Sequence, residues 1–150
     1  MLKEYNRNSP VYGEFKAPNK DMVAGRLVTF DASDPTKIDY ATQATPTAKI
    51  LGLLGQDVIA PNVNTHILPS VATTKVRYGE VVAVFYNDIY ITDQIATNVN
   101  AGDTLWPADS STDATLAGKL SNVEIVGQPP VAVALESGAA GSPVKIKLLV

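Results

Sequence analysis

Short apolar runs separated by turn signals constrain this chain more than any other feature. Past Asn19, β-branched residues dominate the apolar positions, and little 3.6-residue periodicity is sustained. β-branched side chains pack well on a pleated sheet, whereas an amphipathic helix needs apolar residues three and four apart. The sequence therefore predicts an all-β fold with a small β-barrel or β-sandwich body and at most one short helix.

The strands of this body are predicted wherever an apolar run is bounded by Gly, Pro, Asn or Asp. The predicted strands are 26–30, 50–58, 65–69, 75–85, 104–106, 124–126, 131–135 and 144–150. Residues 87–99 carry isoleucines and a valine at mixed spacing, which predicts one short helix or a turn there.

Residues 1–20 depart from this pattern. They are interrupted by Pro10, Gly13 and Pro18, and they show neither helical nor clean strand periodicity. Their aromatic side chains are Tyr5, Tyr12 and Phe15. A polar stretch that still carries aromatic residues is typical of a partner-binding arm, and an inert flexible terminus is the alternative. We expect an extended N-terminal arm over 1–20 with no fold of its own, followed by a body over 21–150.

Charge is divided unevenly between these two parts. The chain has a net charge of -3, yet residues 1–20 hold four basic and two acidic side chains, which leaves 21–150 strongly acidic. Nucleic-acid binding requires clustered Lys and Arg, so the acidic body argues against a nucleic-acid partner. The basic arm either serves solubility or steers docking onto an acidic surface.

The sequence contains no recognisable catalytic constellation. Cysteine is absent, which excludes disulfides and thiolate metal sites. His66 is the only histidine, it has the flanks of a strand residue, and no G-x-S-x-G motif accompanies it. The aspartates of the polar loops are better explained as loop caps than as metal ligands; they are Asp31, Asp34, Asp39, Asp109 and Asp113. We expect neither an enzyme nor a cofactor.

Targeting and membrane signals are also missing. The longest apolar runs, such as 131–135, fall far short of the roughly 18 residues that indicate a membrane span. Polar and charged residues follow Lys3 where a signal peptide would need a continuous apolar region. We expect a soluble protein that is made in the cytoplasm and has no membrane partner.

One enzyme class has about this length and needs separate consideration. Small trimeric nucleotide hydrolases of the dUTPase type use an A-G-x-D-L motif, and residues 101–105 read AGDTL. The aspartate stands one place early, and the glycine-rich phosphate-binding segment is missing. This function is the least favoured of those considered.

Several short segments resemble the phage head decoration proteins, also called capsid cement proteins, of lambda-like heads. The similar segments are RLVTFD at 26–31, AKILGLLGQD at 48–57, DTLWPAD at 103–109, and the closing runs at 125–127, 131–135 and 145–150. The resemblance implies a non-enzymatic homotrimer on the exterior of the virion, bound to the major capsid protein at local threefold positions and stabilising the expanded head. Residues 71–99 look like an insertion relative to the smallest members.

Within that resemblance, the arm is the expected capsid-binding element. An extended segment can add a strand to a sheet edge of another protein, with alternate side chains setting the register. Tyr5, Tyr12 and Phe15 are then the anchors, and Arg7 and Lys16 steer the encounter.

The alternative is a β-rich adhesion or carbohydrate-binding module displayed on a virion. An exposed platform formed by Trp106, Tyr86 and Tyr90 would favour it, whereas a buried Trp106 would count against it.

Overall fold

The computed structural model describes residues 2–4, 10–60 and 75–150. Its strands are β1 (Leu2–Glu4), β2 (Val11–Lys16), β3 (Leu27–Phe30), β4 (Ile38–Tyr40), β5 (Ile50–Leu54), β6 (Asp57–Ile59), β7 (Lys75–Arg77), β8 (Val81–Phe85), β9 (Ile89–Thr92), β10 (Thr104–Pro107), β11 (Leu120–Ser121), β12 (Ala132–Ala134) and β13 (Val144–Leu148). Helical structure in these residues is limited to two 3-10 turns, Thr47–Lys49 and Ala114–Leu116. The all-β prediction is confirmed.

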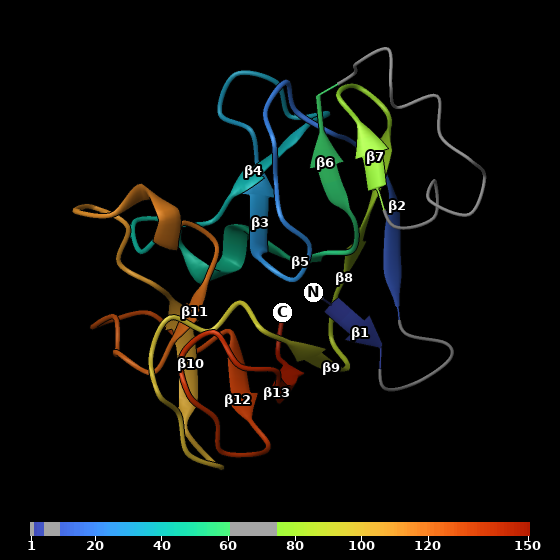
Figure 1. The fold of residues 1–150 in the computed structure, drawn as a ribbon. Coiled ribbons are helices and arrows are strands. Elements are labelled where there is room, and N and C mark those ends of the chain that lie inside the picture. The colour runs from blue at the N-terminus through green and yellow to red at the C-terminus, as the bar shows by residue number, and fades with distance from the viewer. Residues whose placement is uncertain (1, 5–9, 61–74) are drawn as a thin grey trace.

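The strands form two large sheets and a small one. A five-stranded sheet has the order β2-β8-β5-β3-β4, a six-stranded sheet has the order β1-β9-β13-β12-β10-β11, and β6 pairs with β7 in parallel. In Figure 1 the five-stranded sheet occupies the upper half of the molecule and the six-stranded sheet the lower half. The N-terminal strands β1 and β2 therefore lie at edges of two different sheets.

The five-stranded sheet curls toward a barrel. Its two edge regions meet where the backbone N–H of Lys16 donates to the carbonyl of Thr36, at 2.9 Å. Register irregularities between Tyr12 and Phe15 and between Val28 and Thr29 bend the sheet, as β-bulges do. The interior is filled by a cluster of mostly aliphatic side chains, namely Phe15, Ala17, Met22, Val28, Ile38, Leu54, Val58, Val76, Val82 and Val84.

A second core joins this barrel to the six-stranded sheet. Leu27 and Val28 are both fully buried, but Leu27 belongs to the second core and Val28 to the barrel interior, because successive strand residues point to opposite faces. From the six-stranded sheet, Tyr90, Leu105 and Ile146 enter the same cluster as Leu27. The barrel sheet is apolar on both faces, and this arrangement explains its continuous Val, Ile and Leu runs.

Several predicted elements differ from the structure. The predicted strand 50–58 is divided into β5 and β6, and 75–85 into β7 and β8. Residues 124–126 form a loop rather than a strand, and β4 and β11 were not predicted. No helix forms at 87–99, because Tyr90 and Thr92 are buried while Ile89 and Ile91 are half-buried, which is the alternation of a strand. The predicted strand 65–69 lies outside the described residues.

The largest difference concerns the N-terminal segment. The expectation that residues 1–20 have no fold of their own is wrong for the described part, because β1 pairs with β9 and β2 pairs with β8 in the same chain. Phe15 is only 8% exposed and Ala17 is fully buried. The bulge after Tyr12 interrupts the period-2 alternation, so the strand is hidden in the sequence pattern.

Candidate functional site

The outer edge of β2 is the candidate attachment surface. β2 is an edge strand of the five-stranded sheet, and its named strand partner among the described residues is β8. Tyr86 donates its backbone N–H to the carbonyl of Pro10, at 3.2 Å, so the N–H and carbonyl of Val11 point away from β8. An edge strand with outward main-chain groups is a template for pairing with another chain. We call residues 11–15 with this orientation the β2 edge.

Aromatic side chains follow the β2 edge across the mouth of the barrel. The Tyr12 ring stacks on Tyr86 with centroids 4.2 Å apart and meets Phe15 edge-on at 5.9 Å. Phe15 in turn contacts Phe30 of β3 at 5.6 Å. Phe15 is buried, whereas Tyr12 is 36% and Phe30 43% exposed. Of these three rings, only Tyr12 and Phe30 are therefore accessible to a partner.

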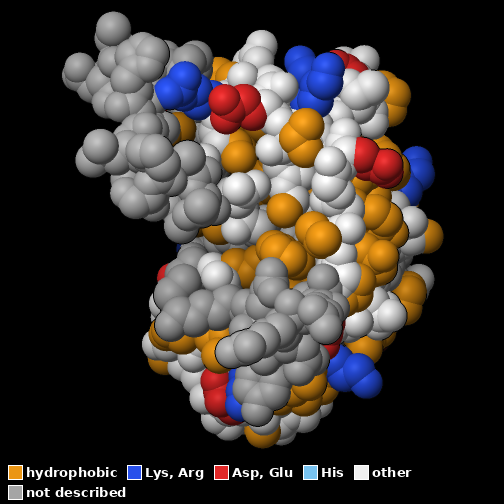
Figure 2. Space-filling view, turned by 90° about the vertical axis from the view of Figure 1, so that its right-hand side faces the viewer, with side chains coloured by type: hydrophobic (Ala, Val, Ile, Leu, Met, Phe, Trp, Pro, Cys, Tyr) orange, Lys and Arg blue, Asp and Glu red, His pale blue; other side chains and the backbone are white. Residues whose placement is uncertain are grey.

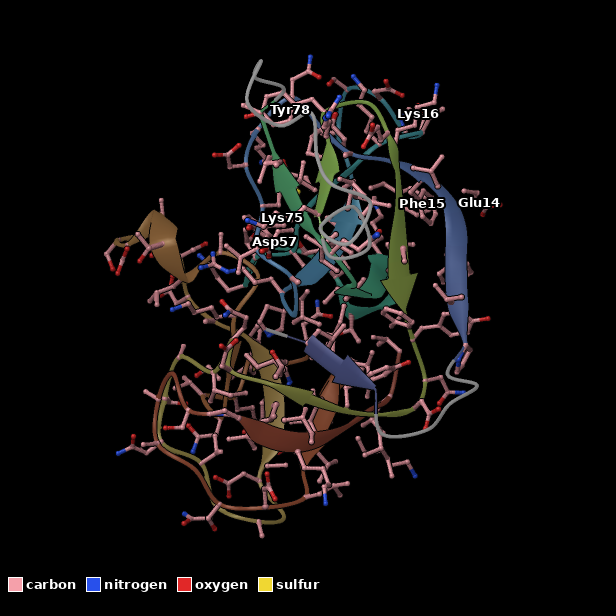
Figure 3. The ribbon with its side chains drawn as sticks, turned by 45° about the vertical axis from the view of Figure 1, so that its right-hand side comes forward. Glu14, Phe15, Lys16, Asp57, Lys75 and Tyr78 are labelled. Carbon is pink, nitrogen blue, oxygen red and sulfur yellow. The ribbon has the colours of Figure 1, made fainter. Side chains whose placement is uncertain are left out.

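Figure 3 shows that Glu14 and Phe15 of β2 point in opposite directions. Glu14 points outward from β2, and Phe15 points toward the barrel interior. The two residues are neighbours on a strand, so their side chains leave on opposite faces. Phe15 therefore holds β2 on its own barrel and is not available to a partner while β2 stays in place.

Exposed apolar side chains accompany the edge. Val11 is 47% and Val81 54% exposed, and Val81 is the register partner of the exposed Lys16. Figure 2, which views the molecule from the side where β2 lies in Figure 1, shows apolar side chains across the middle of that face. Isolated exposed valines are normal, but a group beside an open edge is typical of a protein contact.

Of the predicted arm residues, three lie in the described part of the chain and two lie outside it. The structure brings Tyr12 and Phe15 into contact and leaves Tyr12 and Lys16 exposed. Tyr5 and Arg7 lie outside the described residues, so their capsid-binding role stays a prediction. Sequence reasoning missed Val11 and Val81, because their exposure depends on which strands lie beside them.

Four of the five aspartates predicted as loop caps act as caps, whereas Asp39 lies in β4 and forms an ion pair with Lys20. Asp31 accepts hydrogen bonds from the hydroxyl and the backbone N–H of Ser33, at 2.6 and 2.8 Å, and these bonds lower the pKa of its carboxyl. Asp113 receives the same pair of bonds from Thr115, which likewise lowers its pKa. Among the described residues, no group of three or more His, Asp or Glu side chains could hold a metal ion.

The segment that resembles a hydrolase motif has a structural role in the described part of the chain. Asp103, of the segment that resembles a hydrolase motif, accepts bonds from the backbone of Asn100 and the side chain of Asn122, at 2.9 and 3.0 Å. These bonds lower the pKa of Asp103 and tie two loops together. His66 lies outside the described residues. Over the described ranges, the molecule contains no helix with the length and apolar character of a bilayer span.

The aromatic platform expected of a carbohydrate-binding module is not formed. Trp106 is only 7% exposed, and its indole N–H donates to the carbonyl of Gln128 at 2.9 Å. Tyr90 is fully buried with its hydroxyl bonded to the carbonyl of Tyr86. Buried rings cannot stack on a sugar, so this alternative loses its main support.

Comparison with known proteins gives a likeness of fold. No protein-family model and no curated protein sequence matches the chain. The chain is similar to one in the solved structure of the capsid of Myoviridae phage XM1, with a TM-score of 0.54 and 19% sequence identity. The likeness covers 93% of this chain and 82% of that chain, so it extends over both large sheets.

Proposed function

We propose that this protein is a structural component of a phage virion that binds the outside of an icosahedral capsid and stabilises the expanded head. In this proposal it is a homotrimer at local threefold positions, and its partner is the major capsid protein. The observation that carries the proposal is the similarity of fold, over 93% of the chain, to a chain of a phage capsid. The sequence segments that resemble capsid cement proteins support it independently.

Attachment occurs through the β2 edge. A strand of the shell protein pairs with the outward main-chain groups of β2, and the exposed Tyr12 and Phe30 lie where its side chains would contact the barrel. Lys16 is exposed at the end of the same strand and favours an acidic approach surface. Tyr5 and Arg7 extend the predicted contact toward the N-terminus. Three edges on one trimer raise avidity by about 10² to 10⁴ relative to one.

A proline substitution tests this mode of attachment directly. The Val11 N–H points away from β8, so Val11→Pro removes an edge donor without breaking a bond of the β2–β8 ladder. Val11→Ala is the matched control, because it shortens the same exposed side chain and keeps the N–H. Binding is measured by co-sedimentation of the purified chain with expanded phage heads that lack it.

The expected result is loss of co-sedimentation for Val11→Pro and near-normal binding for Val11→Ala, with both variants folded by circular dichroism. Equal binding of both variants would reject strand addition at this edge. Failure of the unmodified protein to bind any expanded head, or to raise the melting temperature of that head, would reject the proposed function itself.

A further inference from the structure

An exposed apolar loop lies on the side of the molecule opposite β2. The loop joins β11 to β12, and its tip carries Val123, Glu124 and Val126. Val126 is 91% exposed, more than any other large apolar side chain of the described residues, and Val123 is 63% exposed. In Figure 1, β11 and the loops beside it lie at the left and β2 at the right. We call residues 123–126 the valine tip.

The valine tip is held firmly from both ends. At its start, Asn122 accepts from the hydroxyl of Thr97 at 2.8 Å and donates to Asp103 at 3.0 Å. At its end, the carbonyl of Gln128 accepts from the indole of Trp106 at 2.9 Å, and its side-chain oxygen accepts from the backbone of Thr47 at 3.1 Å. A braced loop that exposes two valines loses little entropy when it binds, which favours a protein contact.

A second surface of mixed apolar and basic character covers the outer face of the six-stranded sheet. Residues directly opposite each other share a face, and Val133 pairs with Lys147, which pairs with Ile89. Lys145 pairs with Ile91 on the same face. Leu135 and Leu149, just beyond the strand ends, are 41% and 43% exposed. We call this set the lysine face.

The lysine face has a solvated pattern at β13 and an apolar one at β9, because β13 buries its apolar residues and turns Lys145 and Lys147 outward. A sheet with one face in water normally alternates apolar and polar residues, yet β9 presents isoleucines outward and buries Tyr90 and Thr92 on its other face. The side chains of its isoleucines are half-buried, so further apolar area remains to be removed from water.

We propose that the valine tip of one molecule docks on the lysine face of a second copy of this chain. The tip carries two exposed valines and one carboxylate, Glu124, and the face carries half-buried isoleucines and the exposed ammonium group of Lys147, so the two surfaces match in apolar character and in charge. The two surfaces differ, which makes the contact head-to-tail, and a head-to-tail contact closes into a ring when the rotation allows it. This inference rests on the proposed function, since it assigns residues to the homotrimer.

The cysteine-free sequence allows a direct test. Two single variants are made, Val126→Cys in the tip and Leu135→Cys at the edge of the face, one of them carrying a tag that changes its mass. The full-length variants are mixed, oxidised and separated by size under denaturing conditions. Thr112→Cys, in another exposed loop, replaces Val126→Cys in the matched control.

The expected product is a mixed disulfide dimer of Val126→Cys with Leu135→Cys, at several times the yield of either self-dimer and of the Thr112→Cys control. Equal yields in all mixtures would overturn the inference. A second variant, Val126→Asp, keeps the fold because the side chain is almost fully exposed. It is expected to weaken self-association about tenfold or more in sedimentation velocity.

The outcomes separate this inference from the proposed function. If Val126→Asp leaves self-association unchanged and instead abolishes co-sedimentation with expanded heads, the tip contacts the shell and the inference is wrong. If the unmodified chain stays monomeric at all concentrations but still binds heads, the inference and the proposed homotrimer both fail, and only the proposed attachment to the capsid survives. If Val11→Pro abolishes head binding but leaves self-association unchanged, the inference stands, because the β2 edge is separate from the valine tip and the lysine face.

Discussion

Phe15 decides whether the N-terminal segment belongs to its own body. Its side chain is 8% exposed, packs in the barrel interior and contacts the Tyr12 and Phe30 rings. Replacing a buried phenylalanine by alanine costs about 3–5 kcal/mol, because burial of the ring is lost and a cavity remains. A domain of this size has a free energy of unfolding of about 5–15 kcal/mol, so we expect Phe15→Ala to lower the melting temperature by roughly 6–20 °C.

The measurement is equilibrium urea unfolding together with a thermal scan by circular dichroism. Glu14→Ala is the control, since Glu14 is the next residue, is exposed, and points outward from the same strand. It should change stability by less than about 0.5 kcal/mol. Indistinguishable unfolding curves for the two variants would refute the reasoning. That result would restore the expectation of an N-terminal arm with no fold of its own, and deletion of residues 1–17 should then leave the melting temperature unchanged.

Three further expectations concern the barrel, the loops and the single tryptophan. Gly52→Ala should destabilise the barrel by about 2–5 kcal/mol in urea unfolding, because a Cβ would lie 2.1 Å from the Phe85 carbonyl oxygen and φ is +147°. Gly79→Ala is the control, since the space around Gly79 is open. It should cost only the roughly 1–2 kcal/mol of a left-handed backbone. The capping aspartates, including Asp34, have lowered pKa values in the fold, so they stabilise the fold above their ordinary pKa of 3.8. This stabilisation is lost as the pH falls through their folded pKa values, and urea unfolding at pH 7 and at pH 3 should show the loss. Asp34→Asn should reduce the difference in stability between the two pH values. Trp106 fluorescence should be quenched weakly by acrylamide and should not respond to oligosaccharides, because the ring is buried; strong quenching in the folded state would contradict this burial.

The sequence alone predicted the fold class and the chemistry of the polar loops. β-branched runs between turn residues are a local signal, and they identified β3, β10, β12 and β13 within two residues at each end. The Asp-x-Ser and Asp-x-Thr spacings are also local, since a carboxylate caps the backbone two residues on. Both predictions depend on a few neighbouring residues and hold without knowledge of the rest of the chain.

The candidate site was only partly predictable. Tyr12 and Lys16 were chosen because aromatic and basic residues in a polar stretch suggest a partner, and both are exposed. Phe15 met the same criterion but is buried, since the barrel formed by strands far along the chain provides its pocket. Residues 124–126 of the valine tip were predicted as a strand because Ile125 and Val126 are β-formers, but they lie in the loop that joins β11 to β12.

The linear order of residues determined that this protein is built from strands, has no thiol chemistry and caps its loops with aspartate, because composition and short-range spacing control these properties. Tertiary structure decided that the N-terminal strands complete two sheets of their own chain, that Trp106 is buried, and that two valines of one loop and a sheet face of isoleucines and lysines remain on the surface. Strand pairing joins residues that are distant in sequence, and an edge becomes covered or open only when every neighbour has been placed.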